Sequence, residues 1–203
     1  MIRLGLPKGR MAMATERFCA ALGVMTRSGV LSYQTAVQGL PVSVHLLKAP
    51  DVARLLRRNL LDLGLAGDEW LMETGIRPDR RCFGARSYEA TVCLLMSRDD
   101  PRAPRHIGSV ATPYPNLARG LLRTIAPAAE VLPVSGSSEA LVPGIADACI
   151  DLVETGASAE LNALAVRRCF DHVTTHLVRS ERCDPDTVAP VVARLAGAME
   201  AAR

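Results

Sequence analysis

Short apolar runs alternate with segments of helical spacing along almost the whole chain, and this alternation restricts the fold more than any other feature. A strand, a helix and another strand in succession are typical of parallel sheets with crossover helices. We therefore predict an α/β fold with mixed, mostly parallel sheets. The expected strands cover residues 2–6, 42–46 within an alternating stretch at 30–48, 61–67, 90–97, 106–112, 129–136, 148–153 and 166–180. The expected helices cover residues 11–23, 51–61, 68–75, 114–126, 137–146, the segment ending at 164, and 185–203 behind a capping Asp184.

A polar and charged stretch near residues 78–89 interrupts this pattern and is interpreted as a connection between two lobes. The 203 residues are enough for two small lobes, each with its own core. We predict a first lobe at residues 1–88 and a second at residues 89–175. The C-terminal segment, residues 176–203, is expected to return to the first lobe.

Composition excludes several classes of protein. Aromatic residues make up only 3% of the chain, so the core must be aliphatic, and a net charge of +3 is too small to favour nucleic acid. The chain begins without a sustained apolar segment, and no stretch approaches the length of a membrane span. Six scattered cysteines without a C-x-x-C pair are typical of reduced structural thiols. We expect a soluble, cytoplasmic protein with neither a membrane nor a nucleic-acid partner.

Three polar loops follow predicted strands, namely "PKGR", "TPYPN" and "ETGAS". Ligands of open α/β sheets bind at the carboxyl ends of strands, so a cleft between the lobes lined by these loops would suit a phosphorylated ligand. Lys8 and Arg10 supply positive charge, and the backbone N–H groups of "ETGAS" suit a phosphate. Asp151 and Glu154 are suited to Mg²⁺ or to sugar hydroxyls. The alternative for "ETGAS" alone is a turn with a helix cap.

Other polar residues leave two interpretations open. Asp68 and Glu69 could line a site or only complement the start of a helix, and Glu139 could cap a helix or line the cleft. Tyr114 more often packs than binds. His172 and His176 share one face of a predicted strand, but their Cα atoms would lie about 13 Å apart, too far for easy chelation of one metal ion.

Four segments, taken in order, resemble one enzyme family, the ATP phosphoribosyltransferases, which begin histidine biosynthesis. "LPKGR" is similar to the opening of these proteins, and "LLDLGLAGDEWLMETG" resembles their D-L-G-I-x-G-x-D-x-L-x-E segment. "VATPYPNLAR" resembles their V-A-T-K-Y-P-N stretch. "SGSSEALVPGIADACIDLVETGASAELNAL" is similar to their G-S-x-E…G-L-A-D-x-I-x-D-L-V-x-T-G-x-T-L-x-x-N-G-L segment. The length resembles the short form, which lacks a C-terminal regulatory domain.

This resemblance implies a two-lobed fold like that of periplasmic binding proteins. It also implies attack of N1 of the adenine of ATP on phosphoribosyl pyrophosphate (PRPP), with release of pyrophosphate and with Mg²⁺ carried by PRPP instead of by a protein metal site. A homodimer and a regulatory partner resembling histidyl-tRNA synthetase are implied as well. By analogy, PRPP would be held by Asp151, Glu154, Thr155, Gly156, Ala157 and Ser158, and the nucleotide by Lys8, Gly9, Arg10, Asp68, Thr112 and Tyr114. Lys8, Arg10 and Asp151 are the expected catalytic residues.

The departures from the family pattern lie mainly on the acceptor side. Pro113 replaces the Lys of V-A-T-K-Y-P-N, and "SYEATV" stands where the family has a Cys-Arg pair. Lys48 lies near the position of a usual Arg, Ser158 replaces the second Thr of T-G-x-T-L, and Ala163 replaces the Gly of N-G-L. Two alternatives therefore stand beside ATP phosphoribosylation: a PRPP-dependent transferase with another heterocyclic acceptor, and a catalytically silent binding or regulatory subunit.

Overall fold

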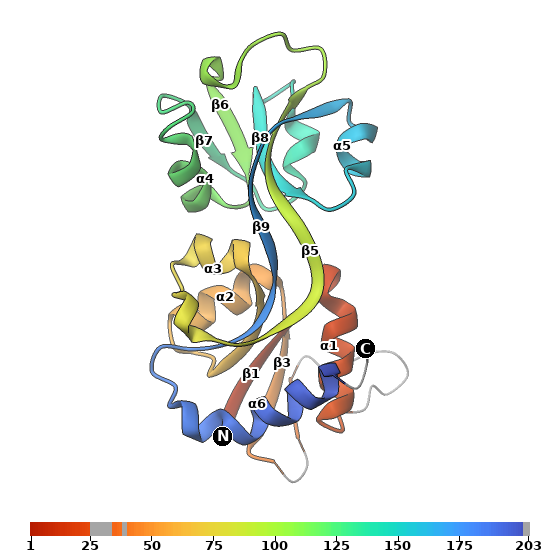
Figure 1. The fold of residues 1–203 in the computed structure, drawn as a ribbon. Coiled ribbons are helices and arrows are strands. Elements are labelled where there is room, and N and C mark those ends of the chain that lie inside the picture. Colours follow the sequence, from red (N-terminus) through yellow and green to blue (C-terminus); the bar gives the residue numbers. More distant parts are fainter. Residues whose placement is uncertain (25–33, 38–39, 201–203) are drawn as a thin grey trace. The chain divides into compact units, whose positions relative to one another are not determined.

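The computed structural model describes residues 1–24, 34–37 and 40–200, which form two compact units (Figure 1). Unit 1 comprises Met1–Tyr88 and Thr174–Arg203, and unit 2 comprises Glu89–Val173. The predicted lobes had their boundaries at residues 88/89 and 175/176. Among the described residues, no helix is both long and apolar enough to cross a membrane.

Unit 1 is built on a mixed sheet. Its strands are β1 (Ile2–Pro7), β2 (Gln34–Ala36), β3 (Val42–Leu47), β4 (Leu63–Gly67) and the part of β9 (Leu164–Arg179) that belongs to this unit. The strand order is β2-β3-β1-β4-β9, where β1 runs parallel to β3 and β4 while β2 and β9 are antiparallel to their neighbours. The central strands are buried on both faces because helices cover each of them, as is usual for parallel strands.

The helices of unit 1 are α1 (Ala12–Ala21), α2 (Ala49–Arg57), α3 (Asp68–Thr74) and α6 (Pro185–Glu200). In Figure 1, α2 and α3 lie on one side of the sheet and α1 and α6 on the other. Helix α2 approaches the sheet closely because Gly64 has no side chain, and a Cβ there would overlap Val52 and Leu56. Asp184 caps α6 as predicted, since its Oδ2 accepts the N–H of Thr187 at 3.1 Å.

Unit 2 holds the remaining strands of the nine-stranded order of the described residues and has its own core. Its strands are β6 (Ser109–Thr112), β7 (Glu130–Pro133) and β8 (Ala148–Val153), with the later part of β5 (Arg81–Ser97) and the first part of β9. β8 is antiparallel to β5 and parallel to β6, which in turn is parallel to β7. The helices are α4 (Pro115–Leu122) and α5 (Ala157–Leu161). Buried members of this core include Cys93, Leu95, Ala111, Cys149 and Leu164. All six cysteines are free thiols.

The polar stretch at 78–89 contains the boundary between the units at residues 88/89, but most of it is a strand, because β5 begins at Arg81 and the side chains of Arg81 and Tyr88 find partners on α3. Two other local predictions were wrong. The helix expected at 137–146 is only a 3-10 turn, η4 (Ser138–Leu141), since Pro143 lacks an N–H and forces Val142 into an extended backbone. The helix expected at 51–61 is shorter, because α2 ends at Arg57, and Leu60 beyond its end is 45% exposed. The parts of the predictions that fall on residues 30–33, 38–39 and 201–203 lie outside the described residues.

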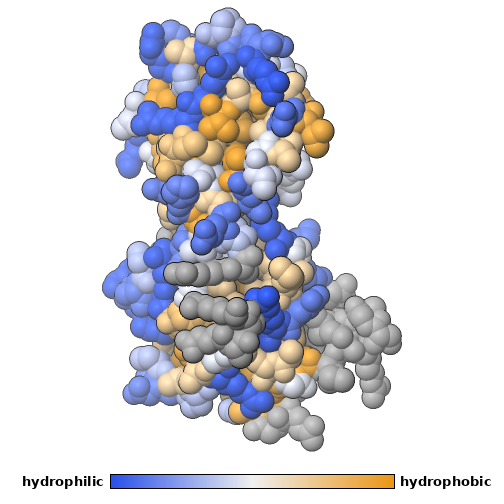
Figure 2. Space-filling model, turned by 45° about the vertical axis from the view of Figure 1, so that its right-hand side comes forward, coloured by the Kyte–Doolittle hydropathy of each residue, from blue (hydrophilic) through white to orange (hydrophobic). Residues whose placement is uncertain are grey.

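The surface of both units mixes charged and apolar side chains. Figure 2 shows hydrophilic residues over much of the face drawn, with apolar groups gathered on part of unit 2. The large exposed apolar residues of unit 2 are Ile145, Leu161 and Val166, of which Leu161 is 87% exposed.

Candidate functional site

The loop after β1 presents two cations to solvent. Lys8, Gly9 and Arg10 are all exposed, and Gly9 has φ +84°, a left-handed conformation that favours glycine. The Lys8 N–H donates to the Leu47 carbonyl at 2.9 Å, which attaches the loop to the end of β3. The loop therefore has the position and the charge expected of a group that faces an anionic ligand.

Asp68, the first residue of α3, is held by three internal partners. Its Oδ1 accepts a hydrogen bond from Arg81 at 2.6 Å, and its Oδ2 accepts the Thr174 N–H at 3.1 Å and a ring N–H of His176 at 3.2 Å. Burial alone would raise the pKa of Asp68, but the hydrogen bonds of His176 and Thr174 and the charge of Arg81 lower it. The structure thus places this predicted nucleotide-binding residue in an ionised network that joins α3, β5 and β9.

The next residue, Glu69, lies in a different environment. Its side chain is almost fully buried, and its Oε1 accepts the Tyr88 hydroxyl at 2.5 Å, while its Oε2 has no hydrogen-bond partner among the described residues. Burial raises the pKa of Glu69 to about 7, against the lowering effects of Tyr88 and of the nearby Arg10. Gly67 completes the cluster, since a Cβ there would overlap the Tyr88 hydroxyl and the Glu69 carboxyl.

Sequence reasoning left the role of Glu69 open, listed only Asp68 of the pair among the site residues, and did not consider Tyr88. A signal for Glu69 was present, because G-x-D of the quoted family pattern falls, in register, on Gly67, Asp68 and Glu69. The carboxylate of the pattern therefore corresponds to Glu69 and not to Asp68. No comparable signal marked Tyr88, which lies in the segment that departs from the family.

The "ETGAS" loop of unit 2 is exposed and locally organised. Gly156 has φ +81° and stands at the N-cap position of α5, while the Ala157 N–H donates to the Thr155 hydroxyl at 3.4 Å. Glu154, Thr155 and Ser158 are exposed. The strand, turn and helix that were predicted here are present, and the loop leaves its hydroxyls at the surface.

Two carboxylates lie beside this loop. Asp151 accepts the Ser138 hydroxyl at 2.6 Å on Oδ2 and the Leu152 N–H at 2.8 Å on Oδ1. The Ser158 hydroxyl donates to Glu139 Oε2. Ser138 is fully buried, so it fixes the orientation of Asp151 from below the surface. Sequence reasoning left Glu139 open, although it is the Glu of the G-S-x-E match, and omitted Ser138, which falls on the variable position of that pattern.

Thr112 and Tyr114 are placed inside unit 2. The Thr112 hydroxyl is fully buried, donates to the Ile150 carbonyl at 2.7 Å and accepts the Tyr114 N–H at 3.0 Å. Tyr114 is buried as well, so the packing alternative describes its side chain. These contacts join β6 to β8 and shape the "TPYPN" loop, while the predicted ligand contacts of both side chains remain predictions.

The predicted site residues therefore fall into two groups, each within one unit. Lys8, Gly9, Arg10 and Asp68 belong to unit 1, and Glu69 and Tyr88 join them there. Asp151 and the "ETGAS" loop belong to unit 2, together with Ser138 and Glu139.

Carboxylates near the loop fit a metal ion that is shared with a phosphate ligand. In residues 1–24, 34–37 and 40–200, no three His, Cys, Asp or Glu side chains converge into a metal cage. Mg²⁺ usually needs only one or two protein carboxylates, with phosphate oxygens and water as its other ligands. Asp151, with its orientation set by Ser138, has the chemistry for such a contact.

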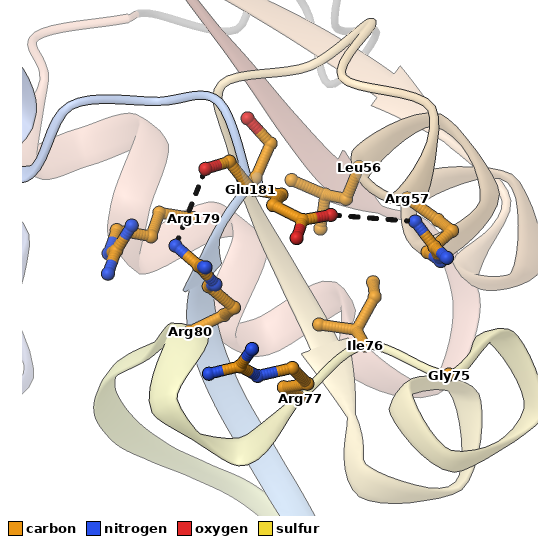
Figure 3. Close-up of a pocket in the computed structure, with 9 residues that line it drawn as sticks. Leu56, Arg57, Gly75, Ile76, Arg77, Arg80, Arg179 and Glu181 are labelled. Atoms are coloured by element: carbon orange, nitrogen blue, oxygen red, sulfur yellow. Dashed lines mark hydrogen bonds and ion pairs between the residues drawn. The ribbon is translucent and has the colours of Figure 1, made fainter.

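A separate concavity in unit 1 is lined by arginines (Figure 3). It has an empty volume of about 420 Å³, part of it open to solvent, and its cations are Arg57, Arg77, Arg80 and Arg179. Each guanidinium has a partner: Glu181 at 3.6 Å from Arg57, Asp79 for Arg77, the Glu181 carbonyl for Arg80 and the Cys183 carbonyl for Arg179. None of the predicted site residues lines this pocket, so we do not assign the transferase chemistry to it.

Comparison with known proteins gives a consistent result. The family model described as ATP phosphoribosyltransferase matches residues 48–199. An ATP phosphoribosyltransferase of Rhodopirellula baltica is 30% identical over 202 residues, which cover 97% of this chain and 67% of the relative. One from Listeria monocytogenes is 29% identical over 184 residues, which cover 87% of this chain and 84% of the relative.

Solved structures resemble the fold. The ATP phosphoribosyl transferase (HisG:HisZ) complex from Thermotoga maritima matches with a TM-score of 0.83 at 22% identity, over 100% of this chain and 99% of that one. The alkanesulfonate-binding protein SsuA from Xanthomonas axonopodis matches with a TM-score of 0.60 at 13% identity, over 99% of this chain and 72% of that one. The predicted α/β fold of the periplasmic-binding-protein type is thereby confirmed.

Proposed function

Because this chain belongs to the ATP phosphoribosyltransferase family, we propose that it transfers the phosphoribosyl group of PRPP to N1 of the adenine of ATP. The family makes the chain a phosphoribosyltransferase, that is, a pentosyltransferase, of histidine biosynthesis. The observation that carries the finer proposal is the arrangement around Asp151, where an oriented carboxylate stands next to an exposed loop with a left-handed glycine.

On the donor side, the loop and the carboxylates suit different parts of PRPP. A carboxylate repels a phosphate but accepts hydrogen bonds from sugar hydroxyls, so Asp151 and Glu139 suit the ribose. The backbone and hydroxyls of Thr155, Gly156 and Ser158 suit the 5-phosphate. In this arrangement the Ser158 hydroxyl exchanges its contact with Glu139 for a phosphate oxygen.

The chemistry needs positioning and charge stabilisation more than a nucleophilic side chain. The C1–O bond to pyrophosphate breaks as N1 of adenine attacks C1, through an oxocarbenium-like state, and the leaving group takes the electron pair. Lys8 and Arg10 are exposed cations that would stabilise the pyrophosphate charge. Asp151 would hold a Mg²⁺ ion that arrives with PRPP, and this ion would supply further positive charge for the leaving group.

Partners follow from the relatives and not from this chain alone. The Thermotoga structure is described as a HisG:HisZ complex, and we propose an equivalent regulatory subunit for this chain. A homodimer is the expected catalytic unit. Co-purification of this chain with a histidyl-tRNA-synthetase-like protein from the same source, read by light scattering, tests both statements.

The proposed reaction is tested by incubating the protein with PRPP, ATP and Mg²⁺ and measuring phosphoribosyl-ATP by mass spectrometry, with and without the regulatory subunit. The expected result is a product with N1 substituted, formed together with one pyrophosphate. Failure under both conditions, by protein that still binds PRPP in calorimetry, would overturn ATP as the acceptor.

The departures from the family pattern on the acceptor side favour a second function. Tyr88 and Pro113 both occupy positions where this sequence departs from the family pattern, and this favours another heterocycle in the place of ATP. A panel of purine and pyrimidine acceptors with PRPP, followed by pyrophosphate release, separates the two functions. Binding of PRPP without turnover of any acceptor would instead indicate a silent binding or regulatory subunit.

A further inference from the structure

Glu69 combines burial with an unsatisfied oxygen. It is only 1% exposed, its Oε1 accepts the Tyr88 hydroxyl at 2.5 Å, and, within the part of the chain that the structure describes, its Oε2 has no hydrogen-bond partner. Leaving a buried carboxylate oxygen unpaired costs free energy, so a group in this state needs a compensating role or a proton. Gly67 has no side chain, and the Glu69 carboxyl and the Tyr88 hydroxyl occupy the space beside it, since any Cβ there would overlap both groups.

The same tyrosine connects the buried carboxyl to the cationic loop. The Arg10 guanidinium carbon lies 5.7 Å from the centre of the Tyr88 ring, within the range of a cation–π interaction. Tyr88 is also held from β9, because the Thr174 hydroxyl donates to its carbonyl at 3.1 Å. The ring is therefore fixed at its hydroxyl and at its backbone, and its face is presented to Arg10.

We propose that Glu69 and Tyr88 are positioning residues for Arg10, and that the charge on Glu69 sets how strongly Arg10 is retained over the ring. The proposal rests on the proposed function in one respect, namely that Arg10 serves an anionic ligand. With Glu69 ionised, Arg10 has a carboxylate neighbour in addition to the ring. With Glu69 protonated, that attraction is removed, and less free energy opposes a contact between the guanidinium and a phosphate oxygen.

The groups that face Glu69 determine how pH changes the affinity of Arg10 for an anion. Burial raises the pKa of Glu69 to about 7, Tyr88 and Arg10 lower it, and Asp68 on the same helix raises it. An anion bound at Arg10 withdraws the cation and adds negative charge, and both changes favour protonated Glu69. Binding of the anion therefore takes up a proton from the buffer, and the affinity falls as the pH rises through neutrality.

The first test needs no ligand. The Nε–H signal of Arg10, identified by its loss in Arg10→Lys, is followed by ¹H–¹⁵N NMR between about pH 5 and pH 9. We expect this signal to titrate near pH 7 in the wild type and not in Glu69→Gln, which keeps the acceptor for Tyr88. Tyr88→Leu should remove the ring-current shift of the signal, while Tyr88→Phe retains most of it. A signal that does not titrate, or that titrates equally in Glu69→Gln, overturns the proposal.

The second test measures binding of inorganic pyrophosphate by calorimetry in buffers of different ionisation enthalpy. The wild type should take up protons near pH 7, and Glu69→Gln should not. Tyr88→Leu removes the cation–π contact with Arg10, and this should change the Kd for pyrophosphate by about two- to fivefold. The matched control is Glu16→Gln, which removes an exposed carboxylate from α1 in the same unit.

The outcomes separate the two proposals. Pyrophosphate-linked proton uptake that depends on Glu69 supports the positioning role even if ATP proves to be the wrong acceptor. Proton uptake that is unchanged in Glu69→Gln overturns the role even if phosphoribosyl-ATP is formed.

Discussion

The "ETGAS" loop of unit 2 and the Glu69 cluster of unit 1 both place carboxylates beside a candidate ligand surface, but they are held in different ways. The loop lies at the surface, where the Ala157 N–H donates to the Thr155 hydroxyl and the Ser158 hydroxyl donates to Glu139. The cluster is buried, since Glu69 is only 1% exposed and accepts the hydroxyl of the buried Tyr88. We infer that the loop acts through local backbone geometry, whereas the cluster acts through electrostatics in a dry environment.

This difference has a consequence for mutation. Changes in the loop should alter ligand binding and leave the rest of unit 2 largely intact. Changes in the cluster should alter stability, pH dependence and ligand binding together, because its partners come from α3, β5 and the loop after β1.

The largest expected effect comes from removing the charge of Glu69. Folding raises the pKa of Glu69 from 4.5 to about 7, so the folded chain holds this proton more tightly than the unfolded chain. The free energy of unfolding therefore falls as the pH rises through this window. Relative to Glu69→Gln, the wild type should lose about 2 to 3 kcal/mol between about pH 5 and pH 8. Urea unfolding of both proteins across this range measures the difference, and parallel curves would contradict the buried titration.

Asp151→Asn tests the donor side. The amide keeps an acceptor for the Ser138 hydroxyl but loses the charge, so the fold should persist while kcat/KM for PRPP falls by roughly 10- to 150-fold, the value of one hydrogen bond to a charged group. The control is Glu160→Gln, which neutralises an exposed carboxylate on α5. Equal values of kcat/KM for PRPP in the two variants would show that Asp151 has a purely structural role.

Gly67→Ala and Gly156→Ala compare the two regions directly. At Gly67 the new Cβ overlaps Tyr88 and Glu69, and such overpacking costs about 1 to 3 kcal/mol. At Gly156 no atom lies within 4 Å of the new Cβ, but φ is +81°, and the left-handed backbone costs about 1 to 2 kcal/mol. Only Gly67→Ala should change the titration of Glu69, which NMR of the carboxyl carbon would detect. A shift of this titration in Gly156→Ala would contradict the independence of the two regions.

The smallest effect is expected from single hydroxyls of the loop. Thr155→Ala and Ser158→Ala should each weaken PRPP binding by about fivefold, equivalent to about 1 kcal/mol for one hydrogen bond. Calorimetry with PRPP measures this change, with Thr124→Ala, at an exposed residue between α4 and β7, as the control. PRPP affinities unchanged from the wild type in both loop variants would contradict the proposal that this loop binds the 5-phosphate.

Much of the architecture was predictable because it depends on local patterns. The buried strands at 2–6, 61–67 and 148–153 are found in place, as is the helix behind Asp184. Predictions were wrong where a tertiary or a backbone effect prevailed over pattern. Residues 81–89 are polar but form a strand, since Asp68 and Glu69 provide partners for their side chains, and Pro143 ends the turn at residues 138–141 before it becomes a helix.

The candidate site also contains residues that the sequence could assign and residues that it could not. The glycines at 9 and 156 could be assigned to loops from sequence alone, because each follows a strand and adopts a backbone that other residues avoid. Local sequence features could not decide which of Asp68 and Glu69 is the carboxylate of the candidate site. Successive residues of a helix point roughly 100° apart, so neighbours in sequence face different surroundings.

The sequence by itself determined the family, the strand-loop-helix units and the loops that end at the candidate site, since these are written in short motifs and local periodicity. The tertiary structure decided which carboxylate is ionised and networked and which is buried. It placed Arg81, Thr174 and His176 around Asp68, and Tyr88 with Arg10 around Glu69. The physical reason is that desolvation and charge depend on neighbours brought from distant parts of the chain.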